Sequence, residues 1–76
     1  MILSQVTRAL PLARSVPLPE GAALLAAHHP QGGELVAVDT LGCQPGDRVV
    51  LGERAAAAAL FGTNCPWDVV VVAVLK

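Results

Sequence analysis

Short apolar segments alternate with glycine and proline along the whole chain. Apolar residues gather at residues 1–10, 22–28, 34–39, 47–51 and 68–75, and glycine or proline stands in most of the intervals between them. Glycine and proline are the residues that most favour turns, so these intervals are expected to be loops. Short strands at this spacing are typical of a small barrel or sandwich, and we predict one strand in each range.

One interval differs, because residues 54–61 are almost entirely alanine, the strongest helix former. Gly62 stands where a glycine commonly ends a helix, so a short helix is predicted between the fourth and fifth strands. The fifth strand carries consecutive valines at residues 69–72 and is apolar on both faces. We expect the barrel core to cover one face and the helix or a neighbouring subunit to cover the other. The pattern predicts an all-β fold, a small five-stranded OB-like β-barrel with one short helix, in which residues 1–76 form a single domain.

The composition contains more apolar residues than a chain of this size can bury. Hydrophobic residues make up 54% of the 76 residues and charged residues only 14%, against roughly a quarter charged in an ordinary soluble domain. A domain this small buries only about two-thirds or less of its unfolded surface. The excess must therefore meet a partner subunit, a membrane or a large apolar ligand. The longest apolar runs, 55–61 and 69–75, are much shorter than the ~18 residues a membrane-spanning helix needs, so self-association is the leading interpretation and no membrane partner is predicted.

Charge and aromatic content argue against nucleic-acid binding. The net charge is −1, the basic residues are scattered, and Phe61 and Trp67 are the only aromatic residues. Small barrels that bind single-stranded nucleic acid combine a basic groove with stacking aromatic rings, and this sequence indicates neither feature. The N-terminal residues do not form a secretory signal, and Cys43 and Cys65 have no partner histidine or cysteine pair at zinc-ligand spacing. Free thiols in a reducing cytoplasm are the simpler interpretation.

The connection at residues 36–51 contains the candidate site. Gly42 and Gly46 can turn the chain through positive φ at little steric cost. Cys43 lies between Asp39 and Asp47, but nearby carboxylates raise the pKa of a thiol, and no activating base is identifiable. We interpret Cys43 as a small side chain in a tight loop rather than a nucleophile. Asp39 and Asp47 are interpreted as turn residues that accept backbone N–H groups, rather than as an acid–base pair.

His28 and His29 are the remaining candidate for chemistry. Adjacent residues on a strand point to opposite faces and cannot easily share one metal ion, so a surface turn leading to Pro30 is the preferred interpretation. We therefore predict no catalytic residue, no cofactor and no metal site.

The order of these features resembles the EutN/CcmL type of bacterial microcompartment vertex protein. The resemblance rests on the first strand at 1–7, the glycine-led second strand at 21–25, the loop at 36–51 with its Gly46-Asp47 pair, and the last strand at 66–72 with Asp68. The chain departs from the family where it has Ser4 in place of a common glycine. It departs again where Cys43 and Gln44 replace alanine and glycine.

The resemblance implies a structural shell protein rather than an enzyme. Such a chain would form a homo-pentamer that caps the five-fold vertices of a bacterial microcompartment, carboxysome-like or metabolosome, beside hexameric shell proteins in the bacterial cytoplasm. It also implies that Gly42, Cys43 and Gln44 lie at or near the central opening of the ring. The alternative is a small OB-like protein- or ligand-binding module that acts as a monomer or dimer, and an enzyme is a distant third.

Overall fold

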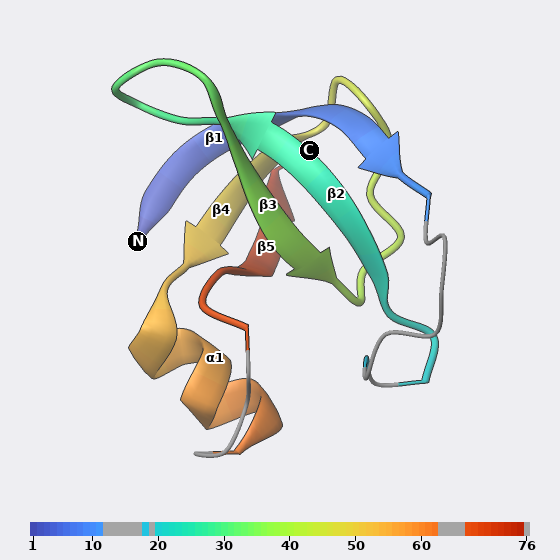
Figure 1. Cartoon of the computed structure of the whole chain (residues 1–76), viewed down its shortest axis with the longest axis vertical. Helices are drawn as coiled ribbons and strands as arrows, with labels where there is room; N and C mark the ends of the chain where they lie inside the picture. Colours follow the sequence, from blue (N-terminus) through green and yellow to red (C-terminus); the bar gives the residue numbers. More distant parts are fainter. Residues whose placement is uncertain (12–17, 19, 63–66, 76) are drawn as a thin grey trace.

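The strands form a closed barrel (Figure 1). A computed structural model describes residues 1–11, 18, 20–62 and 67–75 of the chain. Within these residues the strands follow each other around the barrel in the order β1-β2-β3-β5-β4, and β4 pairs back onto β1. The elements are β1 (Ile2–Leu10), β2 (Ala23–His28), β3 (Glu34–Asp39), β4 (Arg48–Gly52), α1 (Arg54–Phe61) and β5 (Val70–Leu75). The predicted all-β barrel with one short helix is confirmed.

The predicted strand ranges agree with the structure within one residue except at the start of the last strand. β5 begins at Val70, two residues later than predicted, and it joins β3 over a very short stretch. This parallel junction consists of the pairing of Val38 with Val70 and a hydrogen bond of 3.0 Å from the Val38 N–H to the Val69 carbonyl. Every other junction is antiparallel.

The inside of the barrel is filled by aliphatic side chains from every strand. Alternate residues of a strand face the same side, so each strand contributes every second residue to this core. Its buried members are Val6, Leu25, Ala27, Ala37, Val49, Leu51 and Val71.

A second, smaller core lies between the outside of the barrel and α1. Val38, Val70 and Ala57 are buried there, and Phe61 contacts Trp67 edge to face with ring centroids 5.6 Å apart. Figure 1 shows α1 beyond one end of the barrel, at the bottom of the view. Val71 therefore faces the barrel core while its neighbour Val70 faces the helix side, as expected for a strand covered on both sides.

Backbone contacts at each end hold α1 in place. The carbonyl of Glu53 accepts hydrogen bonds from the N–H groups of Ala56 (2.8 Å) and Ala57 (3.0 Å). At the other end Gly62 has a φ of 95° and donates its N–H to the Ala58 carbonyl at 2.8 Å. The predicted helix end at Gly62 is confirmed. No helix among the residues that the structure describes has the length and apolar character to cross a membrane.

Candidate functional site

The loop between β3 and β4 is ordered from its start by Asp39. This carboxylate is only 4% exposed and accepts hydrogen bonds from the N–H groups of Leu41 and Cys43, both at 2.8 Å. The Cys43 thiol also donates to Asp39 Oδ1 at 3.3 Å. A buried carboxylate needs such donors, because an unsatisfied buried charge is costly.

The end of the same loop is held by Asp47 and by β1. Asp47 Oδ2 accepts the Gln44 N–H at 2.8 Å, and the Asp47 N–H donates to the Gln44 carbonyl at 3.0 Å. The Gly46 N–H donates to the Val6 carbonyl at 2.8 Å, and the Val6 N–H donates to the Asp47 carbonyl at 2.9 Å. Gln5 Nε2 donates to the Gly46 carbonyl at 3.0 Å. The loop is therefore fixed to the barrel wall at several points.

Two glycines let the chain follow this path. Gly42 has a φ of 74° and Gly46 a φ of 93°, and residues with a Cβ rarely adopt such values. Both glycines are exposed. Both were predicted from the sequence as glycines that turn the chain through positive φ, and both adopt such values.

The residues predicted to lie at a central opening differ in exposure. Gly42 and Gln44 are exposed, whereas Cys43 is half-buried and packs against the inner barrel core. The described hydrogen bonds of the Asp39 and Asp47 carboxylates go to groups of the loop itself, so these two side chains order the loop. Cys65 and Pro66 lie outside the described residues.

Asp68 and the two histidines lie away from this loop. Asp68 precedes β5 and forms an exposed ion pair of 3.0 Å with Arg54, the first residue of α1. His28 ends β2, and His29 begins a turn in which its N–H donates to the Gly33 carbonyl at 3.0 Å. His29 Nδ1 accepts the Gln31 N–H, also at 3.0 Å. His29 therefore lies in the predicted turn leading to Pro30, whereas His28 is the last residue of β2. Among the described residues, no group of three His, Cys, Asp or Glu side chains gathers where it could hold a metal ion.

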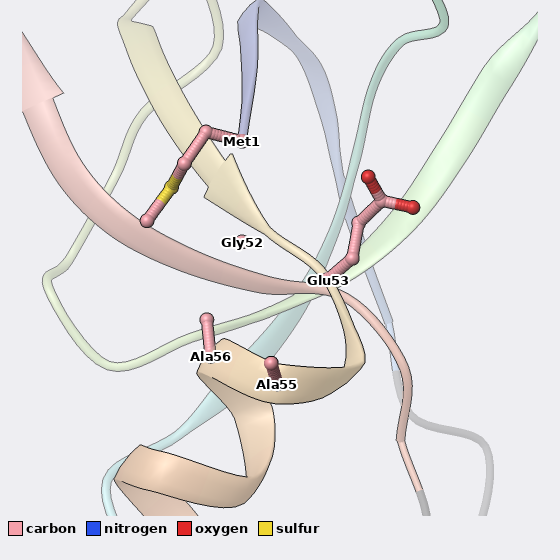
Figure 2. Close-up of a pocket in the computed structure, with 5 residues that line it drawn as sticks. All are labelled: Met1, Gly52, Glu53, Ala55 and Ala56. Atoms are coloured by element: carbon pink, nitrogen blue, oxygen red, sulfur yellow. The ribbon is translucent and has the colours of Figure 1, made fainter.

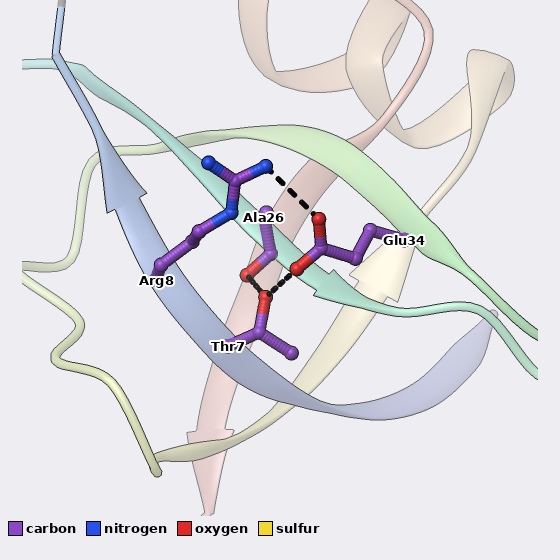
Figure 3. A network of polar contacts seen from close by, with 4 residues as sticks. All are labelled: Thr7, Arg8, Ala26 and Glu34. Carbon is purple, nitrogen blue, oxygen red and sulfur yellow. Dashed lines mark hydrogen bonds and ion pairs between the residues drawn. The ribbon is translucent and has the colours of Figure 1, made fainter.

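A polar network on the outside of β1, β2 and β3 was not anticipated from the sequence (Figure 3). Arg8 Nη2 and Glu34 Oε1 are 3.1 Å apart. Thr7 Oγ1 lies 2.6 Å from Glu34 Oε2 and 3.0 Å from the Ala26 carbonyl, so its single proton can be donated to either. The hydrogen bond and charge of Arg8 hold the pKa of Glu34 below its usual value, and the hydrogen bond from Thr7 acts in the same direction. Only the register of the strands brings these residues together, and the sequence does not display that register.

The rest of the described surface is unusually apolar. Six large hydrophobic side chains are well exposed: Met1, Leu3, Val36, Leu41, Leu60 and Leu75. An open depression of about 220 Å³ lies next to one of them, lined by Met1, Gly52, Glu53, Ala55 and Ala56 (Figure 2). Its lining is almost free of polar groups apart from Glu53.

Comparisons with known proteins agree on the fold. No curated protein sequence matches the chain. Among solved structures, the pentameric shell protein MSM0273 from the RMM microcompartment aligns with a TM-score of 0.82 and 24% identity, covering 100% of this chain and 91% of its own. The GrpN pentameric microcompartment shell protein from Rhodospirillum rubrum aligns with a TM-score of 0.78 and 23% identity, covering 100% and 94%. CcmL from Nostoc sp. PCC 7120 aligns with a TM-score of 0.72 and 26% identity, covering 99% and 86%.

These alignments run over nearly the whole chain, so the similarity is to the complete barrel rather than to one hairpin. A family model described as ethanolamine utilisation protein EutN/carboxysome matches residues 1–75. The chain is therefore a member of the EutN/CcmL family, as the order of its strands and loop indicated.

Proposed function

We propose that this chain is a structural shell protein that forms a homo-pentamer and caps the five-fold vertices of a bacterial microcompartment, carboxysome-like or metabolosome. The family match over residues 1–75 carries the proposal. It is supported by full-length similarity of fold to shell proteins that are themselves described as pentameric. The chain would lie in the microcompartment shell in the bacterial cytoplasm, beside hexameric shell proteins, and it would have no enzymatic role.

The mechanism of such a protein is geometric. Hexameric units tile a flat facet, and a five-fold unit supplies the curvature that closes a corner. Contacts between two different surfaces of neighbouring copies close into a ring when the rotation per subunit divides a full turn. A barrel whose strands pair all the way around is a rigid unit for this purpose, because it has no free sheet edge.

The surface of the single chain supports association. Much of the exposed surface is aliphatic, including Met1 at 79% and Leu3 at 62% exposure. A monomeric binding module would leave these side chains in water.

The loop between β3 and β4 is proposed to border the opening of the ring, with Gly42, Cys43 and Gln44 at or near it. The exposure of Gly42 and Gln44 supports this role, since neither is covered within the chain. The hydrogen bonds of Asp39 and Asp47 support it too, because they hold the loop in one conformation. In a ring, the same loop would be repeated around the axis.

Shell closure tests this function directly. The chain is co-expressed with the hexameric shell proteins of its own organism, and the particles are imaged by electron microscopy. We expect closed polyhedral shells with the chain present, and open or tubular assemblies without it. Equally well-closed shells in the absence of the chain would contradict a vertex role.

A further inference from the structure

One outer face of the barrel is apolar along three neighbouring strands. Ile2, Val49, Leu51 and Val74 pack in or against the inner core, so the residues next to them on β1, β4 and β5 face outward. The strand register places Leu3 beside Val50, and Val50 beside Ala73, in one row across the sheet. Met1 lies two residues before Leu3 at the start of the chain, and Leu75 lies two residues after Ala73 on β5. We call these residues, Met1, Leu3, Val50, Ala73 and Leu75, the apolar face.

The apolar face is open to solvent in the single chain. Met1 is 79% exposed, Leu3 62% and Leu75 40%. The face continues into the depression beside α1, where the side chain of Met1 lies on one side and Ala55 and Ala56 on the other (Figure 2). Polar residues border the face at its other end, where Gln5 pairs with Arg48 across β1 and β4.

The neighbouring part of the barrel surface has a different character. On β1, β2 and β3 the outward residues include Arg8 and Glu34, whose charges pair with each other and with the Thr7 hydroxyl (Figure 3). These charges are satisfied within the chain, although the same surface also carries Val36, which is 55% exposed. The subunit therefore has one side whose charged groups are paired within the chain and one apolar side whose exposure to water is unfavourable.

Charge complementarity indicates that the occupant of the apolar face is a second copy of this chain. Arg48 is exposed at the border of the face and forms no ion pair among the described residues, whereas Arg8 and Arg54 each have one. Glu20 is exposed and likewise forms no ion pair there, whereas Glu53 lies on the apolar side itself, in the lining of the depression. Glu20 precedes β2, away from the apolar face. One copy therefore offers an apolar surface with a cation at its border, and another copy offers the unpaired carboxylate of Glu20.

We propose that the apolar face is one side of the subunit contact and packs against a second copy of this chain, with Arg48 placed to pair with a carboxylate of that copy. The proposal rests on the proposed function, since a ring requires such a contact. To that function it adds the identity of the surface that is buried in the subunit contact. The depression beside Met1 would receive an aliphatic side chain of the neighbouring subunit, as apolar pockets do in head-to-tail assemblies.

The test compares two single substitutions at equally exposed aliphatic residues. Leu3→Glu places a charge on the apolar face, and the matched control Val36→Glu places one on β3, where Val36 is 55% exposed. Both variants are examined by native mass spectrometry, with circular dichroism as the check on folding. We expect Leu3→Glu to lose at least about 90% of the assembled species and to remain a folded monomer, since an unpaired buried charge disrupts an interface. Val36→Glu is expected to keep the assembly.

A second measurement does not depend on how the variants fold. Met1 is the only methionine of the chain, so oxidation by hydrogen peroxide forms a single methionine sulfoxide, which peptide mass spectrometry distinguishes from oxidation of the two cysteine thiols. In the wild-type assembly Met1 should oxidise at least about tenfold more slowly than in the urea-unfolded chain, because access to the sulfur sets the rate. Equal rates would overturn the assignment of the face.

The outcomes separate this proposal from the function it rests on. A wild-type monomer would contradict the ring itself. A wild-type pentamer that survives Leu3→Glu would leave the ring standing and overturn the apolar face as its contact. A head-to-tail ring has two contact surfaces, so loss of assembly in both variants would overturn the assignment only if Met1 is also unprotected from oxidation in the wild-type assembly.

Discussion

At the scale of single residues, the buried carboxylate of Asp39 holds the loop in shape. We expect Asp39→Ala to leave the N–H groups of Leu41 and Cys43 without their acceptor. Hydrogen bonds to a charged group are the strong ones, so the free energy of unfolding should fall by about 2–3 kcal/mol. For a domain of this size that lowers Tm by about 10–20 °C. Thermal denaturation at one fixed protein concentration measures the change.

Asp47→Ala is the matched control for Asp39→Ala. The Asp47 carboxylate accepts one backbone N–H, from Gln44, and that bond is exposed. Its loss should cost only about 1 kcal/mol. If Asp39→Ala were no more destabilising than Asp47→Ala, the buried aspartate would not be what orders the loop.

Glu34 gives the chain a pH dependence with a definite sign. Its folded-state pKa is held below the usual 4.5 by Arg8 and Thr7. Folding therefore gains stability from this group above pH 4.5, and the gain is lost as the pH falls through the lowered pKa. The difference in Tm between wild type and Glu34→Gln should be constant above about pH 4.5 and shrink in more acidic buffer. A difference that grows on acidification would contradict the network.

Residue types alone predicted the roles of some of these side chains and not others. Aspartate and glycine at the ends and bends of a loop have short-range preferences, so Asp39, Asp47, Gly42 and Gly46 could be interpreted from local sequence. The pairing of Arg8 with Glu34 depends on strand register across β1, β2 and β3. No local pattern encodes that register, and the pair was therefore missed.

At the scale of elements, α1 packs against the barrel through a close approach at Gly52. A Cβ added there would collide with Ala56 Cβ and lie 2.7 Å from Val72 Cγ2. We expect Gly52→Ala to destabilise the protein by about 1–3 kcal/mol through overpacking. Ala56→Gly removes the colliding atom. Urea denaturation of both single variants and of the double variant should show that the double variant is more stable than the sum of the two effects predicts. If the effects of the two single substitutions simply added, Ala56 of α1 would lie too far from Gly52 of β4 for their side chains to collide.

The first two residues of β5 are buried on opposite faces, which makes these consecutive valines equally intolerant of charge. Val71 lies in the inner core and Val70 in the second core under α1. Val70→Asp and Val71→Asp should each abolish folding or assembly, because each buries an unpaired carboxylate. Exposed Val36→Asp is the control and should remain soluble. Soluble, fully assembled protein from both core variants, with unchanged Tm, would mean that β5 is an exposed edge.

The elements themselves were predictable because their signals are local. Apolar runs divided by glycine and proline gave the strand ranges, and five consecutive alanines gave the helix. The irregularities were not predictable. Thr7 in β1 and Val72 in β5 are extra residues that shift the register of their strands. Such bulges re-aim side chains without a composition signal of their own.

At the scale of the whole molecule, composition predicted self-association before the surface was known. More than half of the residues are hydrophobic, and the barrel with its second core buries only part of them. The sequence could not indicate which side remains uncovered, since that depends on which strands are neighbours in the closed barrel. β1, β4 and β5 are adjacent in space, although β2 and β3 separate β1 from β4 along the chain and α1 separates β4 from β5.

The mass of the native assembly tests the central claim most directly. The chain has a mass of 7.8 kDa, so a pentamer should have a mass of about 39 kDa by native mass spectrometry or light scattering. Because the proposed contacts are mainly apolar, the pentamer should persist in about 1 M salt, where charge interactions are screened, and weaken in mild denaturant. A clean monomer at tens of micromolar would contradict the vertex role and the explanation of the composition together. A hexamer would be compatible with a shell protein but would contradict the five-fold role.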